Sequence, residues 1–324
     1  MSAKAFICGV KSQYLSAVEH EFLLRMQPYG VILFARNCDN PTQVKTLCAE
    51  IMNCLKHPFA SILIDQEGGR VARLKPPNWR KYPPAAHFKT IEAVKLNARV
   101  IAEELLNLCI TTNCAPLADL PVKYAHDIIG DRAFGSTAEQ VTRFARAQAE
   151  GLMEAGIMPI LKHIPGHGRA RTDSHEELPV VDVSLETLEA TDFVPFRALR
   201  DIPLGMTAHI IYTAIDAKLV ATQSKKVIDY IREVIGFDGL LMSDDLSMKA
   251  LAGTYAKRTK ATFAAGCDLA LHCNGDMAQM HEVASESPEL VGESLRRALK
   301  AKAMMPLARA FSVAEFEHWA KSVA

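Results

Sequence analysis

Residues 157–179 read IMPILKHIPGHGRARTDSHEELP and join two kinds of sequence. The first five residues are apolar and too few for a helix, which predicts a short buried β-strand. The residues that follow carry three histidines, an aspartate, a lysine and two arginines, and their proline and glycines exclude a regular helix. Such a density of proton carriers and cations after a buried strand indicates an active-site loop.

Short apolar runs of the same kind alternate with longer amphipathic stretches along the whole chain. Eight such runs are predicted strands: 5–10, 31–34, 61–66, 110–116, 157–163, 204–211, 239–246 and 269–273. Helices are predicted where apolar residues recur at three- and four-residue spacing, as in 41–56, 91–108, 137–155 and 184–200. This alternation predicts a single α/β domain, a (β/α)8 barrel over residues 1–324 with a C-terminal helical tail from about residue 306.

Local signals mark several helix ends. Asn40 followed by Pro41 suits an N-cap and the first helical position, and Ser136 with Glu139 suits a capping box. Three glycines follow helical stretches directly and are expected to end them: Gly156, Gly236 and Gly266.

The composition excludes several classes of protein. Of 324 residues, 49% are hydrophobic, and 37 Lys and Arg balance 37 Asp and Glu, so we expect no nucleic-acid or membrane partner. No apolar run reaches the length of a membrane span, and the first is too short for a signal-peptide core, which predicts a cytoplasmic protein. We expect a monomer that acts on a small-molecule substrate.

The eight cysteines are interpreted as reduced thiols. No two of them are spaced as Cys-x-x-Cys, and most lie in apolar runs or predicted helices, where cysteine packs as a small hydrophobic residue. A disulfide framework or a zinc ribbon is therefore not expected.

Polar residues gather at the ends of the predicted strands, where α/β barrels place their reacting groups. They are Asp65, Glu67, Arg70 and Arg73 after the third strand, Lys162 and His163 at the fifth, Thr207 and His209 at the sixth, and Asp244 and Asp245 at the seventh. The loop after the fourth strand adds Asp119, Asp127, Asp131 and Arg132. Convergence of these groups on one rim predicts an enzyme.

Structural interpretations stand beside this one. The acids and arginines of residues 65–73 could form an ion-pair network, and His209 could be an ordinary core histidine. Successive strand residues point to opposite faces, so at most one of Asp244 and Asp245 is expected to face a substrate. The other would cap a helix that begins at Leu246. His167 could serve only to stabilise the glycine-rich loop.

The residue types suit glycoside hydrolysis by double displacement. A carboxylate at a strand end can attack an electrophilic carbon, and a histidine on a loop can donate and then accept a proton. Asp173 lies two residues before His175, so its carboxylate can hydrogen-bond one ring nitrogen and raise the basicity of the other. The usual second carboxylic acid of such enzymes is missing from this set.

A zinc-dependent hydrolase is the main alternative from the residues alone. His163, His167, Asp173, His175 and Asp244 offer nitrogen and oxygen ligands that zinc accepts. Against it, a Pro-Gly turn separates the first two histidines, whereas zinc enzymes commonly present them one helical turn apart.

These motifs resemble those of bacterial β-N-acetylhexosaminidases of glycoside hydrolase family 3. The family pattern Lys-His-Phe-Pro-Gly-His-Gly, four further residues and Asp-Ser-His is matched by residues 162–168 and 173–175, with Ile164 in place of phenylalanine. A second signature, Ser-Asp-Asp-Leu-Ser-Met, stands unaltered at residues 243–248. Further matches follow in family order: Gly30–Phe34, Arg36 and Asn37, Asp65–Leu74, Arg132, Phe134 and Gly135, and Met206–His209.

The resemblance implies a barrel that removes nonreducing terminal β-linked N-acetylglucosamine with retention of configuration, and without a metal or other cofactor. It implies Asp244 as nucleophile, His175 as general acid/base and Asp173 as the partner of that histidine. It implies sugar binding by five more residues: Asp65, Arg73, Arg132, Lys162 and His163. Similar family members without an additional domain act in the cytoplasm on N-acetylglucosaminyl-1,6-anhydromuramyl peptides during cell-wall recycling.

Two other functions remain open at this point. A phosphorylase of the same family would use phosphate in place of water, and a sugar-binding protein without turnover would use only the binding residues. The spacer residues Arg169 and Arg171 are hypothesised to approach a carboxylate of the leaving group, the alternative being solvated charges on a loop.

Overall fold

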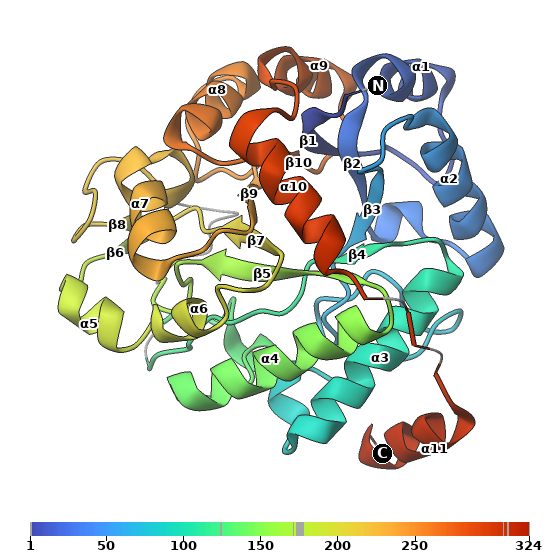
Figure 1. The fold of residues 1–324 in the computed structure, drawn as a ribbon, viewed down its shortest axis with the longest axis horizontal. Coiled ribbons are helices and arrows are strands. Elements are labelled where there is room, and N and C mark those ends of the chain that lie inside the picture. The colour runs from blue at the N-terminus through green and yellow to red at the C-terminus, as the bar shows by residue number, and fades with distance from the viewer. Residues whose placement is uncertain are drawn as a thin grey trace.

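Eight parallel strands close into a barrel, and helices surround it (Figure 1). The computed structural model describes residues 2–123, 125–170, 172, 178–306, 308–309 and 311–323. In their order around the ring the strands are β1 (Lys4–Gly9), β2 (Pro28–Leu33), β3 (Ser61–Ile64), β4 (Thr112–Asn113), β5 (Met158–Ile164), β7 (Leu204–Thr207), β9 (Leu240–Asp245) and β10 (Leu269–His272), which pairs with β1. The predicted (β/α)8 barrel and its eight strands are confirmed.

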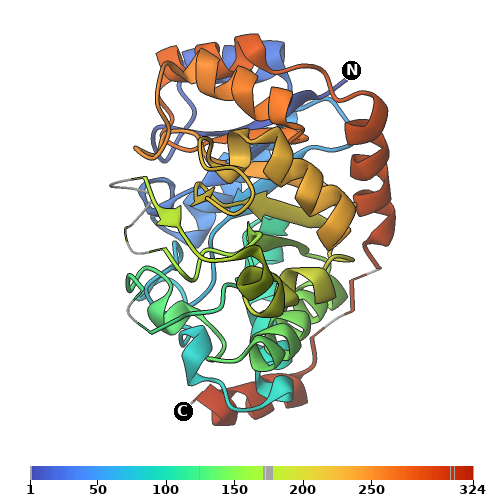
Figure 2. The same cartoon turned by 90° about the vertical axis from the view of Figure 1, so that its left-hand side faces the viewer.

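The helices lie on the outside of the barrel, where α1 to α8 connect successive strands and α9 to α11 follow the last strand (Figures 1 and 2). They are α1 (Ala17–Met26), α2 (Pro41–Cys54), α3 (Ile91–Asn107), α4 (Ala138–Glu154), α5 (Leu185–Ala190), α6 (Val194–Ala198), α7 (Lys225–Tyr230), α8 (Tyr255–Ala265), α9 (Met277–Glu286), α10 (Gly292–Met304) and α11 (Val313–Val323). Short 3-10 turns span Ala35–Asn37, Ala85–His87, Gly130–Arg132 and Ala221–Gln223, and a π-helical turn spans Ile231–Ile235.

Alternation along the strands divides the apolar side chains between two cores. In β1, Ala5 and Ile7 belong to the cluster inside and below the barrel, whereas Phe6 and Cys8 belong to the layer between strands and helices. Seven strands, and the residue directly after β4, contribute to the inner cluster through Ile7, Ile32, Leu63, Cys114, Ile160, Met206, Met242 and Leu271. Because the barrel interior is filled, a polar site has to lie at an end of the barrel, and folds of this kind place it at the C-terminal rim.

Several predicted elements differ in extent from those observed. The strand predicted over 110–116, for example, covers only Thr112–Asn113. The strand predicted over 204–211 ends at Thr207, and Ile211–Tyr212 forms a separate strand, β8, that pairs with β6 (Val180–Val181). The helix predicted over 184–200 is broken between α5 and α6, because Pro195, in the first turn of α6, lacks the N–H that would continue the hydrogen bonds of α5.

The helix-end predictions are confirmed with one correction. The side chain of Asn40 accepts the N–H of Gln43, and the three glycines predicted to end helices all have positive φ. At α4 the cap is Thr137, whose hydroxyl accepts the N–H of Gln140, and not Ser136. The helix therefore begins one residue later than the capping-box pattern suggested.

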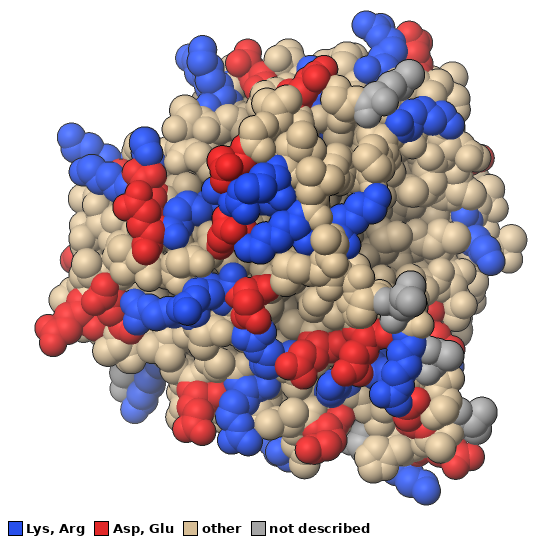
Figure 3. Space-filling view, viewed as in Figure 1, with Lys and Arg blue, Asp and Glu red and all other residues tan. Residues whose placement is uncertain are grey.

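Properties expected from composition are visible on the molecule. Opposite charges lie side by side on the face shown in Figure 3. One cluster of opposite charges on the molecule is formed by Asp238 with Arg296 and Lys300. All eight cysteines are unpaired thiols. Among the described helices, none has the length and apolar character needed to cross a bilayer.

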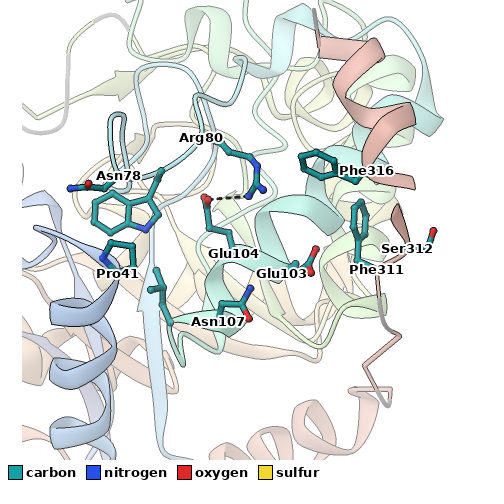
Figure 4. Close-up of a pocket in the computed structure, with 11 residues that line it drawn as sticks. Pro41, Asn78, Arg80, Glu103, Glu104, Asn107, Phe311, Ser312 and Phe316 are labelled. Atoms are coloured by element: carbon teal, nitrogen blue, oxygen red, sulfur yellow. Dashed lines mark hydrogen bonds and ion pairs between the residues drawn. The ribbon is translucent and has the colours of Figure 1, made fainter. Parts of the chain in front are cut away.

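The C-terminal helix α11 lies against α3 (Figures 1 and 2). Trp319 is buried, and its indole N–H donates to Asn97 Oδ1 at 2.9 Å, while Glu315 pairs with the buried Arg99. Figure 4 shows Phe316 beside Arg80, whose guanidinium lies 4.9 Å from the ring centroid. The tail is thus attached by one buried aromatic anchor and several polar contacts.

We predict that Trp319→Ala releases α11 from the barrel. The change removes a buried indole and its hydrogen bond, a loss of about 3–5 kcal/mol for a large aromatic side chain. Since α11 is a terminal helix, that loss should appear as local opening rather than as unfolding of the barrel. Amide hydrogen exchange should become much faster in α11 and stay unchanged in β1 to β5. The exposed His318→Ala on the same helix is the control, and equal exchange in both variants would contradict the prediction.

Candidate active site

A cavity of about 250 Å³ opens at the C-terminal rim of the barrel. Six of the eight residues predicted to act or bind there line it together: Asp65, Arg73, Arg132, Lys162, His163 and Asp244. The other two, Asp173 and His175, lie outside the described residues. The walls also include apolar side chains from several strands and loops, namely Ile32, Phe34, Val71, Ile128, Ile129, Met206, Met248 and Leu271. The rim thus combines charged groups with an apolar surface.

A larger cavity, of about 450 Å³, lies outside the barrel between α3 and the C-terminal tail (Figure 4). Its walls hold the Arg80–Glu104 ion pair together with aromatic and amide side chains. None of the six predicted catalytic or binding residues that the structure describes is among those that line it. The chemistry therefore points to the smaller cavity at the strand ends.

Five side chains of alternating charge form a continuous series along one wall of the rim cavity. Asp65 lies 3.0 Å from Arg73 Nη2 and 2.9 Å from Lys162 Nζ. Glu67 in turn lies 2.6 Å from Lys162 Nζ and holds Arg132 through two bonds of 2.9 and 3.0 Å. Of the residues considered for an ion-pair network at 65–73, Asp65, Glu67 and Arg73 therefore take part in one, which extends to Lys162 on β5 and Arg132 in the loop after β4. Arg70 pairs instead with Asp127 and Asp131.

The series keeps all of its members charged. Burial alone would raise the pKa of Glu67, but Arg132 and Lys162 lower it to about 2. In the same way Lys162 and Arg73 hold the pKa of Asp65 below its usual value, against the effect of burial. Lys162 is only 2% exposed, and its two carboxylate neighbours raise its pKa although burial would lower it.

Gln66 fixes the loop that carries the two acids. Its backbone N–H donates to Asn113 Oδ1, and its side-chain Oε1 accepts the N–H groups of Arg73 and Leu74. Because residues alternate in direction along extended chain, Asp65 and Glu67 point to the same side while Gln66 points away. These hydrogen bonds of Gln66 close the loop, so that Arg73 lies next to Asp65.

Asp119 organises the two histidines of the glycine-rich loop. It is fully buried and accepts the N–H of His163 at 3.2 Å and that of His167 at 2.7 Å. Its other oxygen lies 2.7 Å from His163 Nδ1, and His163 keeps the pKa of this carboxyl below its usual range despite burial. A carboxylate partner places a proton on Nδ1, so Nε2 of His163 is left to accept a hydrogen bond in the cavity.

His167 is buried at the cavity edge, and burial lowers its pKa to about 4. It is therefore neutral at neutral pH. Its backbone N–H bond to Asp119 fits the interpretation that it stabilises the loop.

Asp244 and Asp245, at the end of β9, both line the cavity but differ in their bonds. The carboxylate of Asp245 accepts the N–H groups of Ser247 and Cys273, at 2.9 and 3.1 Å. It therefore closes a turn and ties that turn to the end of β10. The expectation that this residue caps a helix starting at Leu246 was wrong, because α8 begins only at Tyr255. Asp244 is 8% exposed, and its carboxylate accepts the N–H of Asp245 at 2.8 Å.

His209 is a core histidine. It is fully buried, with Nδ1 at 2.8 Å from Thr222 Oγ1 and Nε2 at 3.0 Å from the carbonyl of Asp245. It is absent from the residues that line the rim cavity.

Arg169 serves the fold and is not a solvated charge. Its Nε lies 2.6 Å from the buried carboxylate of Asp192, in the break between α5 and α6, and Nη2 contacts Thr191. The idea that it reaches a substrate carboxylate gains no support from this position. Arg171, the second arginine of that hypothesis, lies outside the described residues.

The described ends of the loop are attached to the rim. The hydroxyl of Tyr212 donates to the carbonyl of Gly166, and the backbone of Gly168 lies so close to Leu120 that a Cβ would meet its carbonyl oxygen. On the other side of residues 173–177, the carbonyl of Pro179 accepts the N–H of Ile211. Residues on both sides of the predicted Asp173–His175 pair are therefore held at the same rim.

Two residues of this arrangement, Glu67 and Asp119, were noticed in the sequence but not assigned to the site. Glu67 could have been found from its spacing, since it lies two residues after Asp65 in extended chain. Asp119 carried no such signal, because its partners are forty-four and forty-eight residues away.

The zinc alternative also involved residues of this rim. Among the residues that the structure describes, no three His, Cys, Asp or Glu side chains are grouped so that they could hold one metal ion. Two of its five proposed ligands, Asp173 and His175, are not described.

We predict that Asp119→Asn reverses the tautomer of His163. The new amide can donate to Nδ1, which moves the ring proton to Nε2 and presents a donor to the cavity in place of an acceptor. We expect kcat/KM to fall about tenfold or more, because a substrate hydroxyl would lose its acceptor. Nitrogen chemical shifts of the imidazole measure the tautomer.

The control for Asp119→Asn is Asp192→Asn, a change at another buried carboxylate with a cationic partner that does not line the cavity. It should lower stability and leave both the tautomer and kcat/KM unchanged. An unchanged His163 tautomer in Asp119→Asn would refute the role given to Asp119.

Comparison with known proteins was made after this geometry. Residues 9–301 match the model of the glycosyl hydrolase family 3 N-terminal domain. A protein from Tolumonas auensis named β-hexosaminidase is 39% identical over 272 residues, 80% of each chain. One of the same name from Methylococcus capsulatus is 39% identical over 270 residues, again 80% of each chain.

Solved structures show the same architecture over nearly the full length of this chain. NagZ from Neisseria gonorrhoeae, in complex with N-trifluoroacetyl-D-glucosamine, superposes with a TM-score of 0.88 at 29% identity, covering 100% of this chain and 98% of that one. A family 3 β-N-acetylglucosaminidase from Paenibacillus superposes with a TM-score of 0.85 at 28% identity, covering 98% of this chain and 67% of that one.

Proposed function

The chain belongs to glycoside hydrolase family 3 and is an enzyme of the β-N-acetylhexosaminidase class, and from that premise we propose a finer activity. We propose that it is a retaining exo-β-N-acetylglucosaminidase that removes nonreducing terminal β-1,4-linked N-acetylglucosamine. The observation that carries this proposal is the convergence of Asp244 with five charged or titratable side chains in one rim cavity.

The cavity wall suits the binding of a single sugar residue. Arg73, Arg132 and Lys162 are donors that can bond sugar hydroxyls, while Asp65 and His163 supply acceptors. Their orientation is set by bonds within the protein, so little freedom is lost when a sugar binds. Apolar residues of the same cavity, such as Met206 and Met248, can cover the less polar face of the sugar or its acetyl methyl group.

Asp244 is the proposed nucleophile. Its carboxylate would attack the anomeric carbon and form a glycosyl ester as the bond to the leaving oxygen breaks. His175, oriented by Asp173, would protonate that oxygen and would then remove a proton from the water that hydrolyses the ester. Two inversions at the anomeric carbon give net retention.

The proposed natural substrates are N-acetylglucosaminyl-1,6-anhydromuramyl peptides, in cell-wall recycling in the cytoplasm. In support, the Neisseria protein that this chain resembles over its whole length binds an N-acylated glucosamine. The peptide of such a substrate would extend from the leaving group, out of the cavity. No cofactor is required in this mechanism.

We predict that Asp244→Ala reduces turnover of an aryl N-acetylglucosaminide by at least about 10³-fold, since it removes the group that forms the covalent intermediate. An activated fluorinated N-acetylglucosaminide should label the wild-type protein at Asp244, as located by peptide mass spectrometry. A label on another carboxylate would contradict the assignment.

The wild-type protein, assayed with and without phosphate, is the reference for the turnover measurement on Asp244→Ala. Proton NMR should show the β-anomer of N-acetylglucosamine as the first product under both conditions. Formation of the sugar 1-phosphate would identify a phosphorylase instead, and loss of activity on chelation would favour the zinc alternative.

We predict that His175→Ala affects poor leaving groups far more than good ones. An alkyl or sugar leaving group needs a proton, whereas a nitrophenolate leaves without one. The first step should therefore slow by about 10²-fold or more for a disaccharide and by much less for the activated aryl glycoside. Equal losses for the two substrates, measured as kcat/KM, would exclude the acid role.

A further inference from the structure

Glu67 lies behind the cavity wall. Its side chain is 9% exposed and is absent from the described residues that line the cavity, yet both of its cationic partners, Arg132 and Lys162, line it. Glu67 can therefore affect a bound sugar only through these two residues.

The hydrogen bonds of Arg132 restrict the orientation of its guanidinium group. Its Nε and Nη2 both donate to the carboxylate of Glu67, and Nη1 donates to the carbonyl of Ile128 at 3.0 Å. A guanidinium has five N–H groups in one plane, so two remain once these three are used. The bidentate contact with Glu67 fixes the plane in which those two lie.

Lys162 is restricted in a similar way. Its ammonium has three N–H groups, of which one donates to Asp65 and another points toward Glu67, 2.6 Å away. One N–H remains, and the group is almost fully buried. Without Glu67 the ammonium would be free to turn toward Asp65 alone, and Arg132 and Lys162, whose like charges already oppose each other, would move apart.

We propose that Glu67 is a positioning residue of the reaction, one that aims the remaining N–H groups of Arg132 and Lys162 at the substrate. The inference rests on the proposed function, since it assumes that these two residues bind the sugar. It predicts that loss of the Glu67 charge weakens substrate binding without removing any atom that touches the substrate.

The chain offers a matched control at the opposite end of the barrel. Asp268, just before β10, is 4% exposed and bridges Arg232 at 2.6 Å and Arg297 at 2.9 Å. It is likewise one buried carboxylate between two cations, and it does not line the rim cavity. Asp268→Asn therefore reproduces the structural effect of losing such a charge, without an effect on the direction of the rim donors.

The test compares Glu67→Gln with Asp268→Asn in the hydrolysis of an aryl N-acetylglucosaminide. We expect Glu67→Gln to raise KM about tenfold or more with a smaller change in kcat, because ground-state and transition-state binding both weaken. Asp268→Asn should lower the melting temperature and leave KM unchanged. A KM within twofold of wild type in both variants would overturn the proposal.

A double-mutant cycle tests whether Glu67 acts through Arg132. If it does, Glu67→Gln should cause a much smaller further rise in KM in an Arg132→Ala background than in the wild type. Independent, multiplying effects of the two changes would refute this route. The cycle needs no assumption about the size of either single effect.

Glu67→Asp keeps the charge but shortens the side chain, so it should hold one cation and give an intermediate KM. If Glu67→Gln does not fold, a wild-type KM in Glu67→Asp overturns the proposal. Failure of both variants to fold also overturns it, because the carboxylate would then serve the fold alone. Absence of activity in the wild-type protein would instead refute the proposed function.

Discussion

The ammonium of Lys162, buried at the end of β5, is the constraint on which the rim depends. A buried charge is tolerated only when opposite charges and hydrogen bonds surround it. Asp65 and Glu67 meet that need, and each brings a further cation, Arg73 or Arg132, that balances its own charge. The series of five charged side chains along one wall of the cavity thus follows from the need to satisfy one buried ammonium group.

Closure of the barrel is what brings these groups together. β3 and β5 are separated by β4 in the ring, and β9 lies two strands beyond β5. Asp65, Lys162 and Asp244 are far apart in sequence, yet parallel strands in one closed sheet place all of their carboxyl ends on the same rim. The filled interior below excludes water from beneath the site, so its polar bonds act in a medium of low dielectric constant.

Much of this could be predicted from local sequence. The eight strands followed from short apolar runs, and several helix ends followed from Asn40, Pro41 and the terminal glycines, because these signals act within a few residues. The failures were also local in cause: Pro195 divides a helix whose apolar pattern continues past it, and Asp245 closes a turn where a helix cap was expected. Arg169 was misjudged because its partner, Asp192, belongs to that unpredicted break.

By itself the sequence determined the fold class, the family motifs and the set of polar residues at the strand ends, since each depends on residue type and spacing alone. Tertiary structure decided which of these residues belong to the cavity and which support the fold. It assigned Asp245 and His209 to the framework, left Asp244 in the cavity wall, and introduced Asp119 and Glu67 as the partners that orient His163, Arg132 and Lys162. The reason is physical: a hydrogen bond or ion pair requires two groups within about 3 Å, and partners distant in sequence reach that separation only when the barrel closes.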